Sequence, residues 1–410
     1  MKKCLLFLSI ALFTVAEINA QFQVGHTTVT FTDPDRNNRE ILTEIYYPAN
    51  TTGDDVEAAE GTFPVIVFGH GFVMVWSAYA NIWEHLVPQG YIMAFPRTEG
   101  NLFPNHAAFG LDIAFLTTEV EAFGADASSI LFQHVAPESA VMGHSMGGGC
   151  SFLAAEAADV NAVVGLAPAE TNTSAIAAAA NVNAPTLVLS GAADGVTPPE
   201  DHHIPIYEAT AAACKHFVSI EEGSHCYFAN SNFNCDFGEF NPGDISRQQQ
   251  QQIMNDLLDP WLEQHLKGGC DAYGAFLAAV DAEPLTSLQG SCEVSGVELD
   301  NPEVTVTECH PVLQTASVDV SIAWSGEAAL QWTVNGEAVS DDQSPLMFTL
   351  AELPAEGQSI DLIIANGDCE WSFPASVSVP EGCEIIFGCT YLEATNYDPA
   401  ANVDDGSCDL

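Results

Sequence analysis

Gly143-His144-Ser145-Met146-Gly147 fits the pattern G-x-S-x-G and stands between two segments of different character. An apolar run at residues 140–143 precedes it, and a helix-like stretch continues through Ala158. A sharp strand-to-helix turn of this kind lifts a serine oxygen out of a sheet, and its glycines allow the backbone to turn without clashes. We therefore predict Ser145 as a nucleophile. The N–H of Met146 is expected to face a developing oxyanion, and His144 is expected to form a wall of the turn and to contact substrate.

The segments around this turn predict a mostly parallel sheet. From Phe63 to about Phe228, short apolar runs alternate with helix-like stretches, which is typical of βαβ units. An earlier amphipathic pair, 24–31 and 40–47, predicts antiparallel strands at one edge. The segment 246–267 carries apolar residues at helical spacing through a run of glutamines, and predicts a closing helix. The apolar runs are 64–68, 91–95, 140–143, 162–166, 186–190 and 217–220.

A serine hydroxyl needs a base, and two later strands end in suitable partners. Asp194 follows the run 186–190, and His225 follows the run 217–220. The order Ser, acid, His is the one that G-x-S-x-G enzymes use, with the histidine as base and the acid fixing its tautomer. We therefore predict a triad of Ser145, Asp194 and His225. The alternatives are Glu200 and Asp201 for the acid, and His202, His203 and His216 for the base.

The turn after the first parallel strand predicts the second oxyanion donor. It reads Gly69-His70-Gly71-Phe72, in which glycines allow close approach of the backbone to a substrate. The N–H of Phe72 is the expected donor, and its ring is expected to contact the acyl group. With Met146 this gives two N–H groups for one oxyanion. Motif, chain order and strand pattern together predict an α/β-hydrolase fold.

The composition predicts an exported chain of several domains. Residues 1–20 run from Lys2 and Lys3 through an apolar stretch to Ala20, which is typical of a signal peptide, so a secreted protein without a membrane span is expected. The catalytic domain is expected at 21–293. Short alternating runs at 296–382 predict a small Ig-like β-sandwich, and 383–410 is a cysteine-bounded acidic tail. The formal net charge of −48 argues against nucleic acid as a partner.

The cysteines of an exported chain can form disulfides. Eleven of the twelve follow the predicted signal peptide, and this odd number leaves at least one unpaired. Cys150 is the expected free thiol, because it falls in an apolar helix. The expected pairs are Cys270 with Cys292 and Cys389 with Cys408, and a Cys226–Cys235 pair is plausible from proximity. Pairing stays open for the remaining cysteines, which are Cys214, Cys309, Cys369 and Cys383.

The stretch from about Pro64 to Cys292 resembles the cutinase-like polyester hydrolases, which include polyethylene terephthalate hydrolases, and their dienelactone-hydrolase and chlorophyllase relatives. The resemblance is carried by residues 143–149, Ala193-Asp194 with Val196-Thr197-Pro198, Pro205-Ile206-Tyr207 and Gly223-Ser224-His225. It implies that Phe72 is the aromatic oxyanion residue, that Val196 lines the acyl cleft and that Cys270 pairs with Cys292. Members often carry a tryptophan where this chain has Ala169, which leaves aliphatic esters as substrates alongside aromatic ones.

The tail resembles the acidic, cysteine-bounded repeats of exported proteins from marine Bacteroidetes. Asp398, Asp404 and Asp405 offer hard oxygen ligands suited to calcium, and an acidic solvated turn is the alternative. We expect no cofactor for catalysis. The β-rich region is expected either to hold the protein on a surface or to act as a spacer.

Two classes of function follow from these observations. The first is hydrolysis of carboxylic esters through an acyl-serine intermediate, on cutin-like or synthetic polyesters, with a lipase, chlorophyllase or acyl-lipid hydrolase as alternatives. The second is a non-catalytic surface-binding protein that uses a decayed hydrolase domain as its scaffold. A complete triad in the required order favours the first.

Overall fold

A computed structural model describes most of the chain after Gln21. The described residues are 22–240, 242–269, 272–292, 298–299, 302–310, 315–325, 331–335, 337–339, 344–354, 358–366, 369–377, 387–401 and 403–410. They belong to two compact units: one extends to Asp259 and includes Val280–Gly290, and the other comprises Pro260–Ala279 and the residues from Ser291 onward. The predicted signal peptide and Cys270 lie outside the described residues.

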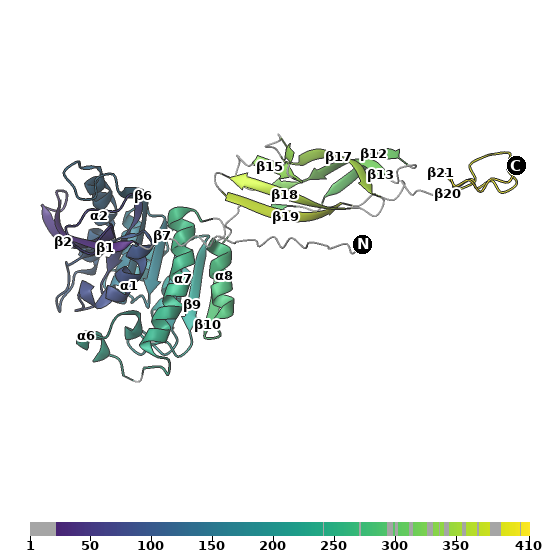
Figure 1. Cartoon of the computed structure of the whole chain (residues 1–410). Coiled ribbons are helices and arrows are strands. Elements are labelled where there is room, and N and C mark those ends of the chain that lie inside the picture. The colour runs from purple at the N-terminus through teal and green to yellow at the C-terminus, as the bar shows by residue number, and fades with distance from the viewer. Residues whose placement is uncertain are drawn as a thin grey trace, which may run out of the picture. The chain divides into compact units, whose positions relative to one another are not determined.

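A ten-stranded mixed sheet forms the centre of the first unit (Figure 1). Its order is β10-β9-β8-β7-β6-β4-β5-β2-β1-β3, in which β4 to β9 run parallel to one another and β2 is antiparallel to both β1 and β5. This confirms the predicted α/β-hydrolase class. The strands are β1 (Gln23–Asp33), β2 (Arg39–Ala49), β3 (Gly53–Asp54), β4 (Phe63–Gly69), β5 (Ile92–Pro96), β6 (Val135–His144), β7 (Ala162–Leu166), β8 (Thr186–Gly191), β9 (Lys215–Ile220) and β10 (Thr286–Ser291).

Helices connect the strands of this sheet, as βαβ units require. The predicted closing helix is α7, which begins at Arg247 and ends at Lys267. One more helix, α8, and the edge strand β10 follow it; neither was predicted from the sequence. The helices are α1 (Ala80–Leu86), α2 (His106–Ala125), α3 (Met146–Ala157), α4 (Ala175–Ala179), α5 (His203–Ala209), α6 (Phe233–Asp236), α7 (Arg247–Lys267) and α8 (Ala272–Ala282).

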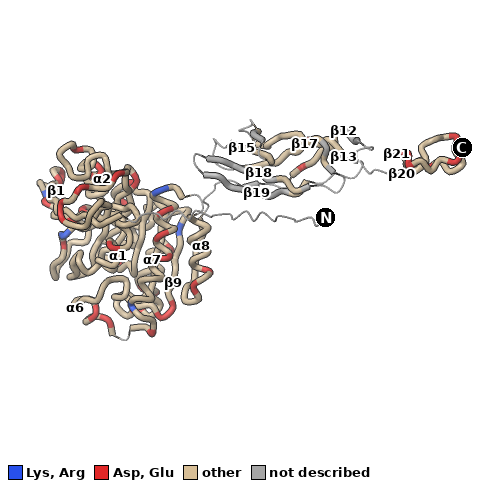
Figure 2. The backbone as a smooth tube through the Cα atoms, viewed as in Figure 1, with Lys and Arg blue, Asp and Glu red and all other residues tan. Residues whose placement is uncertain are grey.

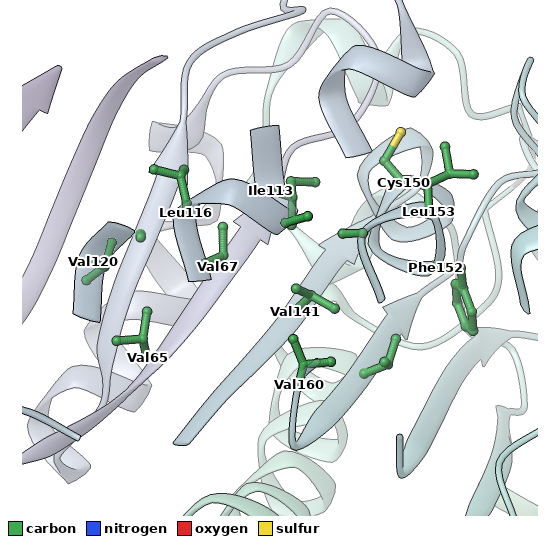
Figure 3. Packing of buried hydrophobic residues seen from close by; sticks show 14 of the residues in the cluster. Val65, Val67, Ile113, Leu116, Val120, Val141, Cys150, Phe152, Leu153 and Val160 are labelled. Atoms are coloured by element: carbon green, nitrogen blue, oxygen red, sulfur yellow. The ribbon is translucent and has the colours of Figure 1, made fainter. Parts of the chain in front are cut away.

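The core packs α2 and α3 against the middle of the sheet (Figure 3). Strands that are covered on both faces read as continuous apolar runs, and β4 and β7 are buried along their whole length. Residues at helical spacing on α2 face the strands, as Ile113, Leu116 and Val120 do. Cys150 on α3 is buried in the same cluster as a free thiol, as predicted.

A buried carboxylate fastens the antiparallel edge to α2. Asp112 has no exposed surface and accepts hydrogen bonds from Arg36, Arg39 and Thr98 at 2.6–2.7 Å. A buried charge is tolerated only where charged and hydrogen-bonding partners compensate it, and here two guanidinium groups do so. The arginines belong to the β1–β2 hairpin, so this network fixes the position of the hairpin on α2.

The second unit contains two antiparallel sheets with a common core. The core residues come from both sheets and include Val318, Trp332, Leu346 and Ile360. This is the pattern of a β-sandwich. The sheets are β12-β13-β17 and β16-β15-β18-β19, with strands β12 (Glu303–His310), β13 (Thr315–Ile322), β15 (Gln331–Val334), β16 (Glu337–Val339), β17 (Leu346–Pro354), β18 (Gln358–Asn366) and β19 (Cys369–Val377). Two short pairs accompany them: β11 (Glu298–Leu299) with β14 (Trp324–Ser325), and β20 (Phe387–Gly388) with β21 (Val403–Asp404).

Acidic residues are spread along the backbone of the first unit, and basic ones are few (Figure 2). In the described parts of the chain, no helix combines the length and the hydrophobicity that a membrane crossing needs.

Two leucines on α2 provide a matched test of this packing. Leu116 is fully buried and Leu111 is 43% exposed on the same helix. Leu116→Ala should lower the free energy of unfolding by about 2 to 5 kcal/mol, because it leaves a cavity beneath the sheet. Leu111→Ala should change it by less than about 1 kcal/mol. Urea denaturation of both variants measures the difference, and equal losses would contradict the packing described here.

Candidate active site

Ser145 occupies a strained turn between β6 and α3. Its φ is +58°, a left-handed conformation that is rare for serine and typical of a nucleophile held at a sharp turn. Strand β4 passes very close to this turn. Glycine at 147 makes this approach possible, because a Cβ there would lie 2.0 Å from the carbonyl oxygen of Gly69. Backbone bonds from Ser145 N to Leu166 O (3.0 Å) and from Ala169 N to Ser145 O (2.9 Å) fix the turn to β7 and the loop after it. The structure thus has the sharp strand-to-helix turn at G-x-S-x-G, and the role of Ser145 as nucleophile stays a prediction.

Asp194 and His225 meet after two neighbouring strands. Asp194 follows β8 and His225 follows β9, and the imidazole Nδ1 donates to the carboxylate Oδ2 at 2.7 Å. His225 also lies next to the serine turn, because its carbonyl accepts a hydrogen bond from the ring of His144 at 3.0 Å. With Nδ1 bound to the carboxylate, Nε2 is the nitrogen available to a serine hydroxyl. The geometry required of an acid and base pair is present.

Several donors hold Asp194 in its ionised form. Burial alone would raise the pKa of its carboxyl, but the hydrogen bond and charge of His225 and the N–H of Thr197 lower it below its ordinary value. The second oxygen, Oδ1, accepts the N–H groups of Val196 and Thr197, each at 2.8 Å. The carboxylate therefore stays charged and fixed in orientation.

A hydroxyl and a second histidine extend this pair; the sequence offered His203 only as an alternative base and predicted no role for the Thr197 hydroxyl. The hydroxyl of Thr197 donates to Asp194 Oδ2 at 3.0 Å and lies 2.9 Å from Nδ1 of His225 and 3.0 Å from Nε2 of His203. His203 is fully buried, and its Nδ1 lies 2.8 Å from the hydroxyl of Ser190. In the sequence, Thr197-Pro198-Pro199 indicates only a turn. It does not indicate that the following helix places a histidine beside Asp194.

The structure separates the alternatives for acid and base. Glu200 and Asp201 are exposed, whereas Asp194 is buried. His202 accepts the N–H of Glu170 at 2.9 Å, and His216 lies inside β9. Of these candidates, only His225 donates a short hydrogen bond to the buried carboxylate.

The expected oxyanion donors lie at the start of α3 and in the loop after β4. Met146 is the first residue of α3, where N–H groups have no acceptor within the helix. Phe72 follows β4, and the neighbouring N–H of Gly71 is held by the Tyr79 hydroxyl at 2.8 Å. The side chains of Phe72 and Val196 are 47% and 38% exposed, so both are accessible to a ligand.

His144 is not the substrate-contacting wall that the sequence suggested. Its side chain has no exposed surface, and both ring nitrogens are engaged, one by the Tyr79 hydroxyl at 3.0 Å and one by the His225 carbonyl at 3.0 Å. Side chains alternate between the two faces of a strand, so the His144 ring points away from the Ser145 side chain and into the protein interior. It supports the backbone of His225 from inside the protein.

The glutamine run of α7 supports the segment around His225. The buried side-chain amide of Gln250 makes two bonds to the backbone of Ser224, accepting its N–H and donating to its carbonyl, each at 2.8 Å. A disulfide joins Cys226 to Cys235 in α6. The run is therefore part of the framework of the site.

The other cysteines and the tail carboxylates stand as follows. Cys389 and Cys408 form the expected disulfide, and Cys292 is disulfide-bonded, although its expected partner Cys270 lies outside the described residues.

Asp398, Asp404 and Asp405 each accept a backbone N–H two residues ahead, at 2.9–3.0 Å. In the described part of the tail they do not gather into one set of ligand atoms. A calcium site there stays a prediction.

His203 makes the stability of the protein depend on pH. Burial lowers its pKa to about 3, so the unfolded chain, with an ordinary histidine, binds one more proton between about pH 6.5 and 3. Stability must therefore fall as the pH drops through this window, by about 1.4 kcal/mol per pH unit for this residue. His203→Gln should remove that part of the slope in urea denaturation between pH 6 and 4. His134→Gln, at a surface ring, should leave the slope unchanged. Equal slopes for wild type and His203→Gln would refute the assignment.

Known proteins are similar in sequence to this chain at low identity. A cutinase, est1 of Thermobifida alba, is 27% identical over 185 residues, which cover 44% of this chain and 56% of that protein. Chlorophyllase-1 of Citrus sinensis and its counterpart in Citrus unshiu are each 32% identical over 119 residues, or 27% of this chain and 34% of theirs. The chain thus spans between a third and somewhat over half of the length of these relatives. The profile of the PET hydrolase-like (PETase) family matches residues 19–246, more than half of the chain, and the protein therefore belongs to the PET hydrolase-like family.

Proposed function

We propose that the protein is a serine carboxylic ester hydrolase that acts through an acyl-serine intermediate. The observation that carries the proposal is the 2.7 Å bond from His225 to the buried Asp194, beside a serine held at φ +58°. A positioned base with its orienting acid is what a weak hydroxyl nucleophile needs. Membership of the PET hydrolase-like family supports the same chemistry.

The proposed reaction has two halves. The Ser145 oxygen attacks the ester carbonyl carbon while its proton passes to Nε2 of His225, and the N–H groups of Met146 and Phe72 stabilise the oxyanion. The carbon–oxygen bond to the alcohol then breaks, and His225 returns the proton to the leaving oxygen. Water attacks the acyl-serine with His225 again as base, which releases the acid and restores the serine. Asp194 stays ionised throughout and stabilises the imidazolium.

Exposed apolar side chains around the site favour a bulky, apolar ester such as a polyester. Large exposed hydrophobic patches on a soluble protein mark binding surfaces. The loop that carries Phe240 passes within 3.6 Å of the position that a Cβ on Gly195 would occupy, next to Val196. The side chain of Asn234 reaches the carbonyl of Val73, so α6 adjoins the Phe72 loop. The exposed residues are Phe72, Val75, Val196, Phe233, Phe237 and Phe240, which we call the apolar rim.

The relatives leave other acyl esters as alternatives within the same mechanism. Two of them are chlorophyllases, and Ala169 offers no ring for stacking on an aromatic acyl group. Aliphatic polyesters and large lipid-like esters therefore stand beside polyethylene terephthalate as candidates. A non-catalytic binding role is the contrasting hypothesis, and it predicts a serine that does not react.

We also propose that the protein is secreted. The disulfides Cys226–Cys235 and Cys389–Cys408 support an oxidising compartment, and the leader-like residues 1–20 support export.

Replacing the serine tests the mechanism. Ser145→Ala should lower the release of p-nitrophenol from short acyl esters at least about a thousandfold, because no acyl-enzyme can form. A fluorophosphonate probe should label the wild type and fail to label this variant. Ser128→Ala, at an exposed turn, serves as the control and should retain full activity and labelling. Unchanged turnover in Ser145→Ala would exclude the mechanism.

The apolar rim predicts a selective effect on solid substrates. The double variant Phe233→Ser/Phe237→Ser should lose roughly tenfold or more activity on an aliphatic polyester film, because each exposed ring contributes about 1.5 to 3 kcal/mol when fully buried. Hydrolysis of a soluble p-nitrophenyl ester should change less than about twofold. Leu392→Ser, an equally exposed site in the tail, is the control. Equal losses on film and soluble ester would show that the rim does not act in substrate docking.

A further inference from the structure

A second carboxylate, that of Glu239, holds the backbone at His225. Its Oε1 accepts the N–H of His225 at 2.5 Å, and its Oε2 accepts the N–H of Cys226 at 3.0 Å. These residues begin a short 3₁₀ turn, Cys226–Phe228, whose first N–H groups need acceptors from outside the turn. Glu239 lies 14 residues further along the chain, and the disulfide between Cys226 and Cys235 ties the intervening loop to the same point.

Side chains from several elements bind the remaining polar groups of this backbone. The carbonyl of His225 accepts from His144, and the carbonyl of Cys226 accepts from the guanidinium of Arg247. Gln250 holds the backbone of Ser224. Of these groups, Glu239 alone adds a negative charge beside the histidine. The other ionisable groups near the ring are Asp194 with His203 behind it, and His144, whose ring centre lies 4.6 Å away.

Burial of Glu239 outweighs the groups that stabilise its charge. Burial raises the pKa of its carboxyl above the ordinary value and the negative charge of Asp194 adds to the rise, while the N–H groups of Cys226 and His225 and the charge of His225 oppose it only in part. The other terminal nitrogen of Arg247 donates a hydrogen bond to Asp236, so Asp236 neutralises part of the positive charge of Arg247. The carboxylate of Glu239 is therefore directed at the His225 backbone and influences the His225 imidazole ring through space.

We propose that Glu239 is a positioning residue for the catalytic base: it fixes the backbone of His225 and, as an anion, favours the imidazolium that forms during ester cleavage. The inference rests on the proposed role of His225. Its physical content is that two carboxylates share the stabilisation of one imidazolium. Asp194 acts along a direct hydrogen bond, and Glu239 acts through the backbone and across space.

The pH dependence of the reaction separates this role from a purely structural one. Glu239→Gln removes the charge with little change in size, so the imidazolium becomes less favourable. The acidic limb of the kcat/KM profile should move to lower pH by about 1 unit, and kcat at the optimum should fall about tenfold. The same shift should appear in the titration of the His225 ring carbon signal by NMR. The NMR titration does not require the variant to be an active enzyme.

Two further variants isolate the charge from the geometry. Glu239→Asp keeps the anion on a shorter side chain, so it should lower kcat with less than half of the pH shift. Gln250→Ala loosens the same backbone without changing any charge, and should lower kcat with no shift. Exposed Glu60→Gln controls for loss of a distant charge.

The outcomes distinguish this proposal from the proposed function. A Glu239→Gln variant that folds, as its circular dichroism and melting curve show, but leaves both titrations unshifted overturns the electrostatic role. If Glu239→Gln does not fold, the NMR titration of Glu239→Asp decides, and a shift of 1 unit there overturns the role. Full activity of His225→Ala would instead refute the proposed function, whatever the NMR titration of Glu239→Gln shows.

Discussion

The close approach of β4, β6 and α3 around Ser145 is the constraint on which the site depends. The backbone atoms of Gly69, Gly143 and Gly147 leave no room for a Cβ, and the serine between them is held in a left-handed conformation. Such strain costs about 1 to 3 kcal/mol and persists only where the surroundings enforce it. Buried strands on both sides and the packing of α2 and α3 provide that enforcement. The catalytic geometry is thus a product of the core.

Much of this arrangement was predictable because it depends on local pattern and chain order. The strand runs, the G-x-S-x-G turn and the order of Ser145, Asp194 and His225 are readable in one sequence, since parallel strands bring their carboxyl ends to one edge. The antiparallel hairpin and the buried thiol of Cys150 follow from periodicity in the same way. Edge strand β10 was missed, because most of its side chains are exposed and the strand carries little apolar pattern.

The supporting residues could not be predicted, for a physical reason. His203, Glu239 and Gln250 reach the site from a helix, a loop and a distant helix, and each acts through a side-chain hydrogen bond that local sequence pattern does not specify. Their residue types are common on solvated surfaces. The same limit explains His144, whose position next to the serine suggested contact with substrate while its strand turned the ring inward. Motifs identify reacting groups, and tertiary structure alone identifies what orients them.

The rarity of basic residues has a consequence for how this surface can change. Of eight Lys and Arg, Lys2 and Lys3 lie in the leader-like segment, and the other six all have partners. These pairs are Arg36 and Arg39 with Asp112, Arg97 with Glu44, Lys215 with Thr210, Arg247 with Asp236 and Lys267 with Glu263. Five of these six cations join different segments of the chain, whereas the Lys267–Glu263 pair lies within α7. Further acidification can proceed by exchanging neutral residues, whereas replacing any of the other five cations would remove a connection between segments of the fold.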